Sequence, residues 1–220
     1  HDRCELSADV VNPKLNKDAI KKTLVSLRAF YKRLRDEDKP SRNEAEFIAY
    51  ELLVNYETFG SSLCAFDVPG DVLRSYPVQQ AIAIGKAYEV SNYRRFFNLI
   101  ARAEFIVACA AHPMFAKMRH SAVHGMSKAY RSLPLAEVVH MLGMDHEQAA
   151  LELCQHYSLP VKTGAGGVSS VHFSAWKGKK RPAMANHREA RLIAAKAPEW
   201  SIPESMVYEP FADAGKVALR

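Results

Sequence analysis

The chain has 220 residues, of which 48% are apolar and 25% are charged, and its formal net charge is +6. These values are ordinary for a soluble globular protein with one large domain or two small ones. No apolar run approaches the roughly 18 residues that a membrane-spanning helix needs. The chain begins with His1 rather than methionine, so we expect a fragment, in which the absence of a signal peptide carries no information.

Four cysteines, Cys4, Cys64, Cys109 and Cys154, are far apart and form no CxxC pair. This spacing predicts reduced, mostly buried thiols of an intracellular protein rather than a disulfide framework. Cys109 stands three residues before His112, which suggests a thiol–base pair. No third residue is placed to orient that pair, so we interpret Cys109 as a buried structural cysteine.

The first predicted element is a helix that starts near Asn16 and is ended by Pro40. Apolar residues recur along it at spacings of four, three, four and three, which places them on one helical face. They are Ile20, Leu24, Leu27, Tyr31 and Leu34.

A second helix follows the residues SRNE at 41–44, a capping-box pattern in which a hydroxyl and a carboxylate satisfy backbone N–H groups. Asn43 and Glu46 offer the same pattern two residues later, so the sequence leaves the start of this helix open. We expect Gly60 to lie beyond its end and residues 58–70 to form an irregular link. Its apolar face is predicted to carry Phe47, Tyr50 and Val54, with Ile48 and Leu52 beside them.

Further helical segments follow with short links. Pro77 suits the first turn of one of them, and Ser91 or Asn92 can cap the next. No convincing strand precedes Ser132. Antiparallel helix pairs of this kind are typical of an α-solenoid, although no clean 34-residue repeat is present. The predicted segments cover about 71–75, 77–90, 92–103, 104–111 and 114–131.

The pattern changes at Pro134. A short helix over 135–142 is closed by Gly143, and Asp145 is predicted to cap a helix over 146–157. Two short β segments come next, joined by four residues, Gly164-Ala165-Gly166-Gly167, that suit a hairpin. Three helices followed by a hairpin is the order of a winged helix. The alternative is a plain helical array with a disordered end, and the glycine-rich hinge favours the wing.

Several groups of residues are candidates for sites of chemistry. His120 and His124 could share a helix face, but zinc needs at least a third ligand. The glycines near 164 lack the lysine of a phosphate-binding loop, and no catalytic pattern is evident, so we predict no enzyme, cofactor or metal. In the helix over 92–103, helical spacing predicts a core face with two arginines at its solvated edge. The core residues are Tyr93, Phe96, Phe97 and Ile100, and the edge residues are Arg94 and Arg95.

Positive charge is concentrated after the predicted wing. Residues 176–220 contain nine Lys/Arg against five Asp/Glu, a net charge of +4, whereas residues 1–175 carry only +2. The run WKGKKRP at 176–182 could be a nucleic-acid contact, a targeting signal or a solvated loop, and the whole tail could be merely solubilising. The helix over 146–157 has two Glu and no Lys or Arg, so it suits protein packing better than a DNA groove. The predicted nucleic-acid contacts are Lys162, Trp176, Lys177, Lys179, Lys180, Arg181 and Arg188.

Five segments resemble the GANP family of nuclear mRNA-export scaffolds. The more specific are NEAEFIAYELL at 43–53 and NYRRFFNLIARA at 92–103. The resemblance covers most of residues 1–175, but the link at 58–76 differs and the tail beyond about Pro182 shows no clear match. The other segments are HDRCE at 1–5, MRHSAVHGMSKAYR at 118–131 and PLAEVVHMLGMDHEQAALELCQHYSLPV at 134–161.

The resemblance implies a PCI-type architecture, with a location in the nucleus at or near the nuclear pore. It implies that the winged helix packs against a second PCI-type subunit, that a small acidic Dss/Sem-type peptide rides on that subunit, and that the pair presents a basic surface to RNA or DNA. Splicing-linked PCI proteins share the NEAEF-like run, so the subfamily stays open. An interaction subunit of a splicing-linked, proteasome-lid-like or initiation-factor-like assembly, with no nucleic-acid role, is the alternative.

The fold predicted overall is mainly α. Helical-hairpin, TPR-like repeats over 1–132 lead into a winged-helix module over 133–175, with the helix over 114–131 as the first helix of that module. Residues 176–220 form a basic extension. No membrane contact is expected.

Overall fold

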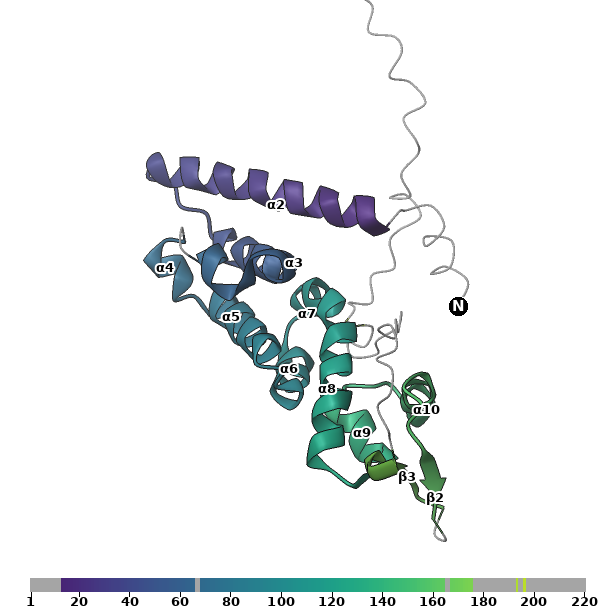
Figure 1. The fold of residues 1–220 in the computed structure, drawn as a ribbon. Coiled ribbons are helices and arrows are strands. Elements are labelled where there is room, and N and C mark those ends of the chain that lie inside the picture. Colours follow the sequence, from purple (N-terminus) through teal and green to yellow (C-terminus); the bar gives the residue numbers. More distant parts are fainter. Residues whose placement is uncertain (1–12, 66–67, 165–166, 176–192, 194–195, 197–220) are drawn as a thin grey trace, which may run out of the picture.

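A computed structural model describes residues 13–65, 68–164, 167–175, 193 and 196 (Figure 1). The fold is mainly helical, as predicted, with one small sheet. The long α2 lies across one end of the molecule in Figure 1, α3 to α7 step away from it, and α8 to α10 lie with the sheet at the other end. The helices are α2 (Pro13–Asp36), α3 (Glu44–Ala65), α4 (Gly70–Leu73), α5 (Tyr76–Glu89), α6 (Tyr93–Arg102), α7 (Phe105–Ala111), α8 (Phe115–Ala129), α9 (Leu135–Met141) and α10 (Glu147–His156). The shorter elements are the 3-10 helices η1 (His112–Met114) and η2 (Phe173–Ala175) and the strands β1 (Ser132–Pro134), β2 (Val161–Thr163) and β3 (Ser169–His172).

The long helix α2 starts earlier than predicted. Its first residue is Pro13, and proline suits a first helical turn because that position needs no backbone N–H. Because the helix starts at residue 13, Asn16 lies inside it and does not cap it. The predicted stripe is only partly covered. Leu24 and Tyr31 are buried against α3, whereas Ile20 remains 43% exposed. The first half of α2 therefore keeps an apolar surface.

The capping-box carboxylates of α3 have other partners. The carboxylate of Glu44 accepts hydrogen bonds from Arg35 Nε on α2, at 2.7 and 2.9 Å. The carboxylate of Glu46 accepts from the hydroxyl of Tyr50 at 2.5 Å. The first of these contacts ties α3 to α2. Arg35 also pairs with Asp71 of α4 at 2.8 Å and so joins three helices.

The predicted end of α3 was wrong. The helix continues through Gly60 to Ala65, so the first part of the expected irregular link is helical. A glycine inside a helix costs about 1 kcal/mol relative to alanine, which is why Gly60 resembles a helix end in the sequence. Tyr56, one turn before Gly60, is buried against α5, and its ring lies 5.8 Å from that of Tyr88 in an edge-to-face contact.

Gly85 lets α3 and α5 approach closely. A Cβ added at Gly85 would lie 2.1 Å from Cε2 of Tyr56. Tyr56 is only 6% exposed, and its hydroxyl donates to Glu89 at 3.1 Å, so moving the ring aside would disturb both its packing and this hydrogen bond. We expect Gly85→Ala to lower the free energy of unfolding by about 2 kcal/mol, as in other overpacked cores. Urea denaturation of the two proteins measures the change.

Gly125 of α8 provides a matched control. A Cβ at Gly125 would have its nearest neighbour, an atom of the Tyr93 ring, at 3.8 Å, which is an ordinary contact. Gly125→Ala should therefore raise the free energy of unfolding by about 1 kcal/mol through helix propensity alone. If Gly85→Ala also raised the free energy of unfolding, the Tyr56 ring would have moved aside at little energetic cost.

The middle helices confirm the sequence-based boundaries to within about a residue. Asn92 rather than Ser91 caps α6, because its Oδ1 accepts from the backbone N–H of Arg95 at 3.1 Å. The predicted core face of α6 is confirmed: Phe96, Phe97 and Ile100 are buried. Its two arginines, Arg94 and Arg95, are exposed as predicted.

The C-terminal part of the described chain has the element order expected of a winged helix. Its order is α8, β1, α9, α10, β2 and β3, and the strands pair antiparallel in the order β1-β3-β2. The hairpin of β2 and β3 was predicted, but β1 was missed. The expected Asp145 cap of α10 was also wrong. The N-cap is His146, whose Nδ1 accepts from the backbone N–H of Ala149 at 3.0 Å.

Candidate nucleic-acid interface

The sheet of the winged helix has one apolar and one polar face. Val171 of β3 is fully buried and pairs with Val161 of β2 and Leu133 of β1. The next register position faces the other way, because side chains alternate along a strand. There Lys162 pairs with Ser170, and the Lys162 side chain is exposed. The structure therefore places Lys162, one of the predicted contacts, on the outer face of the sheet.

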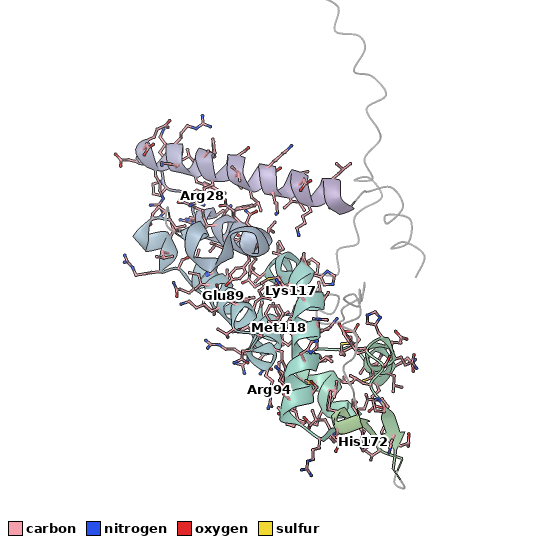
Figure 2. All side chains as sticks on the ribbon, in the orientation of Figure 1. Arg28, Glu89, Arg94, Lys117, Met118 and His172 are labelled. Carbon is pink, nitrogen blue, oxygen red and sulfur yellow. The ribbon has the colours of Figure 1, made fainter. Side chains whose placement is uncertain are left out.

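His172 is on the same outer face, two residues along β3 from Ser170 and opposite Ser132 of β1. Figure 2 shows His172 at the sheet end of the molecule. Apart from Pro134, the paired positions of this face carry hydroxyls, an imidazole and one lysine. Each of these groups can donate a hydrogen bond to a phosphate oxygen.

The end of the sheet is fixed to the end of α8 by Arg131. The carbonyl oxygen of Arg131 accepts hydrogen bonds from the backbone N–H groups of Phe173 at 2.9 Å and Ser174 at 3.2 Å. The basic run begins at Trp176, two residues after Ser174. Arg131 is exposed, so its side chain adds a cation next to the start of that run. Sequence reasoning missed this residue, because only the recognition of β1 brings Arg131 beside the hairpin.

Acidic residues are absent from a long stretch around this point. Between Glu152 and Glu189 the sequence contains six Lys/Arg and no Asp or Glu. Of the predicted contacts, Lys162 is described. The others, Trp176, Lys177, Lys179, Lys180, Arg181 and Arg188, lie outside the described residues.

Helix α10 has the opposite character. Its exposed residues include Glu147 and Glu152, and its buried residues, Ala150, Leu153 and Cys154, pack into the module. An exposed face that is acidic repels phosphate, so this helix does not suit a nucleic-acid groove.

Two later residues of the chain contact the helical body. The Nζ of Lys196 donates to the carbonyl oxygen of Ile100 at 2.5 Å and also to that of Ala103. These carbonyls belong to the last turn and C-cap of α6, where a cation is favourable because the helix dipole is negative there. Burial lowers the pKa of Lys196. Ile193 packs against the core. The chain is therefore held beside α6 again at a point beyond the basic run.

The histidine pair on α8 is part of a packed contact. The rings of His120 and His124 have centroids 5.1 Å apart, and Nδ1 of His120 lies 2.8 Å from the hydroxyl of Tyr157. Within the described residues no three His, Cys, Asp or Glu side chains gather as a metal site would require.

The interpretation of Cys109 as a buried cysteine was wrong, because its side chain is exposed on α7. Partial burial nevertheless raises the pKa of its thiol, which is opposite to what a nucleophilic cysteine needs. Cys154 is buried, as predicted, with its pKa raised to about 11. Cys4 lies outside the described residues, as does the side chain of Cys64. In the part of the chain that the structure describes, no helix has both the length and the apolar character to cross a membrane.

Helical hairpins that lead into a winged helix define the architecture of a PCI-type helical protein. The model of the SAC3/GANP family matches residues 1–163, and the chain belongs to that family. It is 30% identical over 174 residues to Protein xmas of Drosophila melanogaster and 25% identical over 170 residues to SAC3 family protein B of Arabidopsis thaliana. These alignments cover 74% and 69% of this chain but only 8% and 10% of the two relatives. The chain thus corresponds to a small part of each, and the family match ends before the basic run.

Proposed function

We propose that this chain is a non-enzymatic scaffold subunit of a nuclear mRNA-export complex, acting at or near the nuclear pore, and that it binds RNA or DNA without sequence specificity. Membership of the SAC3/GANP family supports the scaffold role. One observation carries the nucleic-acid role. The 36 residues between Glu152 and Glu189 hold six cations and no acid, and they include the exposed face of the wing.

The chemistry of this stretch suits single-stranded nucleic acid. Lys and Arg side chains neutralise phosphates, and an aromatic ring such as that of Trp176 stacks on a base of any sequence. Arg131 and Lys162 extend the cationic surface onto the folded module. The acidic α10 does not enter a groove, so recognition depends on charge and stacking rather than on base edges.

The winged-helix module is also proposed to pack against a second PCI-type subunit, which carries a small acidic Dss/Sem-type peptide. The acidic exposed face of α10 supports a protein-facing role for that side of the module. It also favours the second candidate function, a PCI-type interaction subunit of another assembly without direct nucleic-acid contact. A mobility-shift experiment distinguishes the two.

Charge reversal of three residues in the basic run tests the nucleic-acid role. For Lys179→Glu, Lys180→Glu and Arg181→Glu combined, we expect the affinity for a single-stranded RNA to fall about a hundredfold at 0.1 M salt, and the slope of log K against log salt to shrink by about 2. A variant that lacks three phosphate contacts releases fewer counterions when it binds, and this reduces both its affinity and its dependence on salt. Fluorescence anisotropy over a salt series measures them.

The control reverses three exposed cations far from the wing, Arg42→Glu, Arg74→Glu and Lys86→Glu, with the same change in net charge. This control should bind RNA several-fold more tightly than the triple variant in the run. Equal losses of RNA affinity in the two triple variants would mean that binding depends only on the net charge of the protein. Unchanged binding in the run variant would exclude the assigned contacts and leave the interaction-subunit function.

A further inference from the structure

An apolar groove of about 590 Å³ lies between α2, α3 and the segment formed by α7 and η1. The first half of α2 forms one wall through Ile20 and Leu24. Leu53 and Val54 of α3 form the floor, and Ile106 and Pro113 line the opposite wall. Ile106 is 51% exposed, so part of this lining faces solvent. One wall is therefore formed by the first half of α2, and the other ends at η1, which leads directly into α8.

One wall of the groove belongs to the basic first half of α2, whose edge along the groove we call the rim. The first ten residues of that helix, 13–22, contain four Lys and one Asp, for a net charge of +3. Lys17 lines the groove itself. An occupant that combines apolar side chains with acidic ones would match both the lining and the rim.

We propose that residues 198–213 of this chain, PEWSIPESMVYEPFAD, bind in this groove as a strap. The strap contains four Asp/Glu and no Lys or Arg, which complements the basic rim. It also carries apolar side chains for the lining, among them Trp200, Ile202 and Phe211. Its three prolines suit an extended segment that lies along a groove.

The position of Lys196 brings the strap to the groove. The amine of Lys196 is fixed to the carbonyls of Ile100 and Ala103, and Ile106, in the first turn of α7, is three residues beyond Ala103. The strap begins two residues after Lys196. Because an extended residue spans about 3.3 Å, the 16 residues of the strap reach well along the groove. The strap is independent of the proposed RNA contacts, since the groove contains none of them.

The exposed thiol of Cys109, which lines the groove, provides the first test. In a Cys4→Ser, Cys64→Ser background the remaining thiol, Cys154, is buried and has a raised pKa. We compare the rate at which Ellman's reagent modifies Cys109 in the 220-residue chain and in a chain that ends at Lys196. With an effective concentration of about 1 mM and a Kd of about 100 μM, the strap would slow the reaction about tenfold. Equal rates, with matching circular dichroism spectra, overturn the proposal.

The fluorescence of Trp200 provides a second test from the side of the strap. In a Trp176→Phe background Trp200 is the only tryptophan left. Ile106→Glu, an exposed position that places a carboxylate in the groove, should shift the Trp200 emission to longer wavelength and increase its quenching by acrylamide. Val90→Glu is the control, because Val90 is 72% exposed and does not line the groove. No shift with Ile106→Glu, or an equal shift with both variants, contradicts the strap.

Other occupants give distinct results. If a second copy of the chain fills the groove, protection of Cys109 disappears on dilution. If residues 1–12 fill it, their deletion removes protection and truncation at Lys196 does not. Either result overturns the strap, whereas protection that is independent of concentration and lost on truncation supports it.

Discussion

Phe96→Ala is expected to lower the free energy of unfolding by about 4 kcal/mol, the largest effect that we predict for a single substitution. Phe96 is fully buried at the centre of the helical body. Its ring contacts those of Phe97 and Phe115 edge to face, with centroids 5.1 and 5.8 Å away, and lies 6.1 Å from Tyr88. Alanine removes these contacts and leaves a cavity that helices fixed by several neighbours cannot fully close.

A loss of this size is a large share of the roughly 5–15 kcal/mol that stabilises a typical domain, so the variant should unfold at much lower urea concentration. Urea denaturation followed by circular dichroism measures it. Asn98→Ala, on the exposed side of the same helix, is the matched control and should change stability by less than about 0.5 kcal/mol. A cost below about 2 kcal/mol for Phe96→Ala would mean that the aromatic cluster repacks around the missing ring.

Arg119→Ala is expected to cost about 3 kcal/mol, because it removes a buried charge together with its hydrogen bonds. Arg119 is 4% exposed on α8. Its Nε donates to the carbonyl oxygen of Leu142 at 3.2 Å and its Nη2 to that of Gly143 at 2.9 Å. The guanidinium carbon also lies 5.5 Å from the ring centroid of Phe97 and from that of Phe115. This one side chain therefore holds the turn after α9 against α8.

Burial lowers the pKa of Arg119 to about 10, and the opposing influence of Asp145 is smaller. The side chain is therefore still charged at neutral pH, and its hydrogen bonds offset the cost of burying the charge. Alanine would leave two buried carbonyls without their donors.

Arg119→Met separates packing from hydrogen bonding, since methionine fills similar space but donates no hydrogen bond. If the hydrogen bonds dominate, Arg119→Met should be nearly as destabilising as Arg119→Ala, and Arg119→Lys should recover part of the loss. Thermal and urea unfolding of the three variants measure this order. A methionine variant as stable as the original protein would show that the two carbonyls find other partners.

Local patterns are sufficient to predict most of the helices. The helices α5, α6 and α7 carry their own signals, namely a proline in the first turn, an Asn cap and apolar spacing of one face. The errors fall where the local signal is weak or is overridden. Gly60 resembles a helix end, yet it lies within α3, which packs on α5. The strand β1 has three residues, which is too short for an alternating pattern to be detected.

Some features of the candidate interface are likewise visible in the sequence, and others depend on contacts between distant residues. Its charge is a property of composition, so the cationic stretch that contains Lys162 is visible in the sequence. The contribution of Arg131 is not, because it depends on backbone hydrogen bonds to residues about 42 positions later. The contact of Lys196 with the end of α6 spans 93 and 96 positions and has no local signature.

Periodicity, caps and charge are therefore enough to assign most of the helices, the winged-helix order and the basic extension, since each depends on residues only a few positions apart. These local signals do not tell which apolar helix faces become buried against other helices. Ile20 belongs to the same predicted stripe as Leu24, but only Leu24 is buried, because α2 extends beyond the helices that could cover its first half. Only the packing of α2, α3 and α7 creates the groove beside Ile20, because burial depends on which distant segments meet.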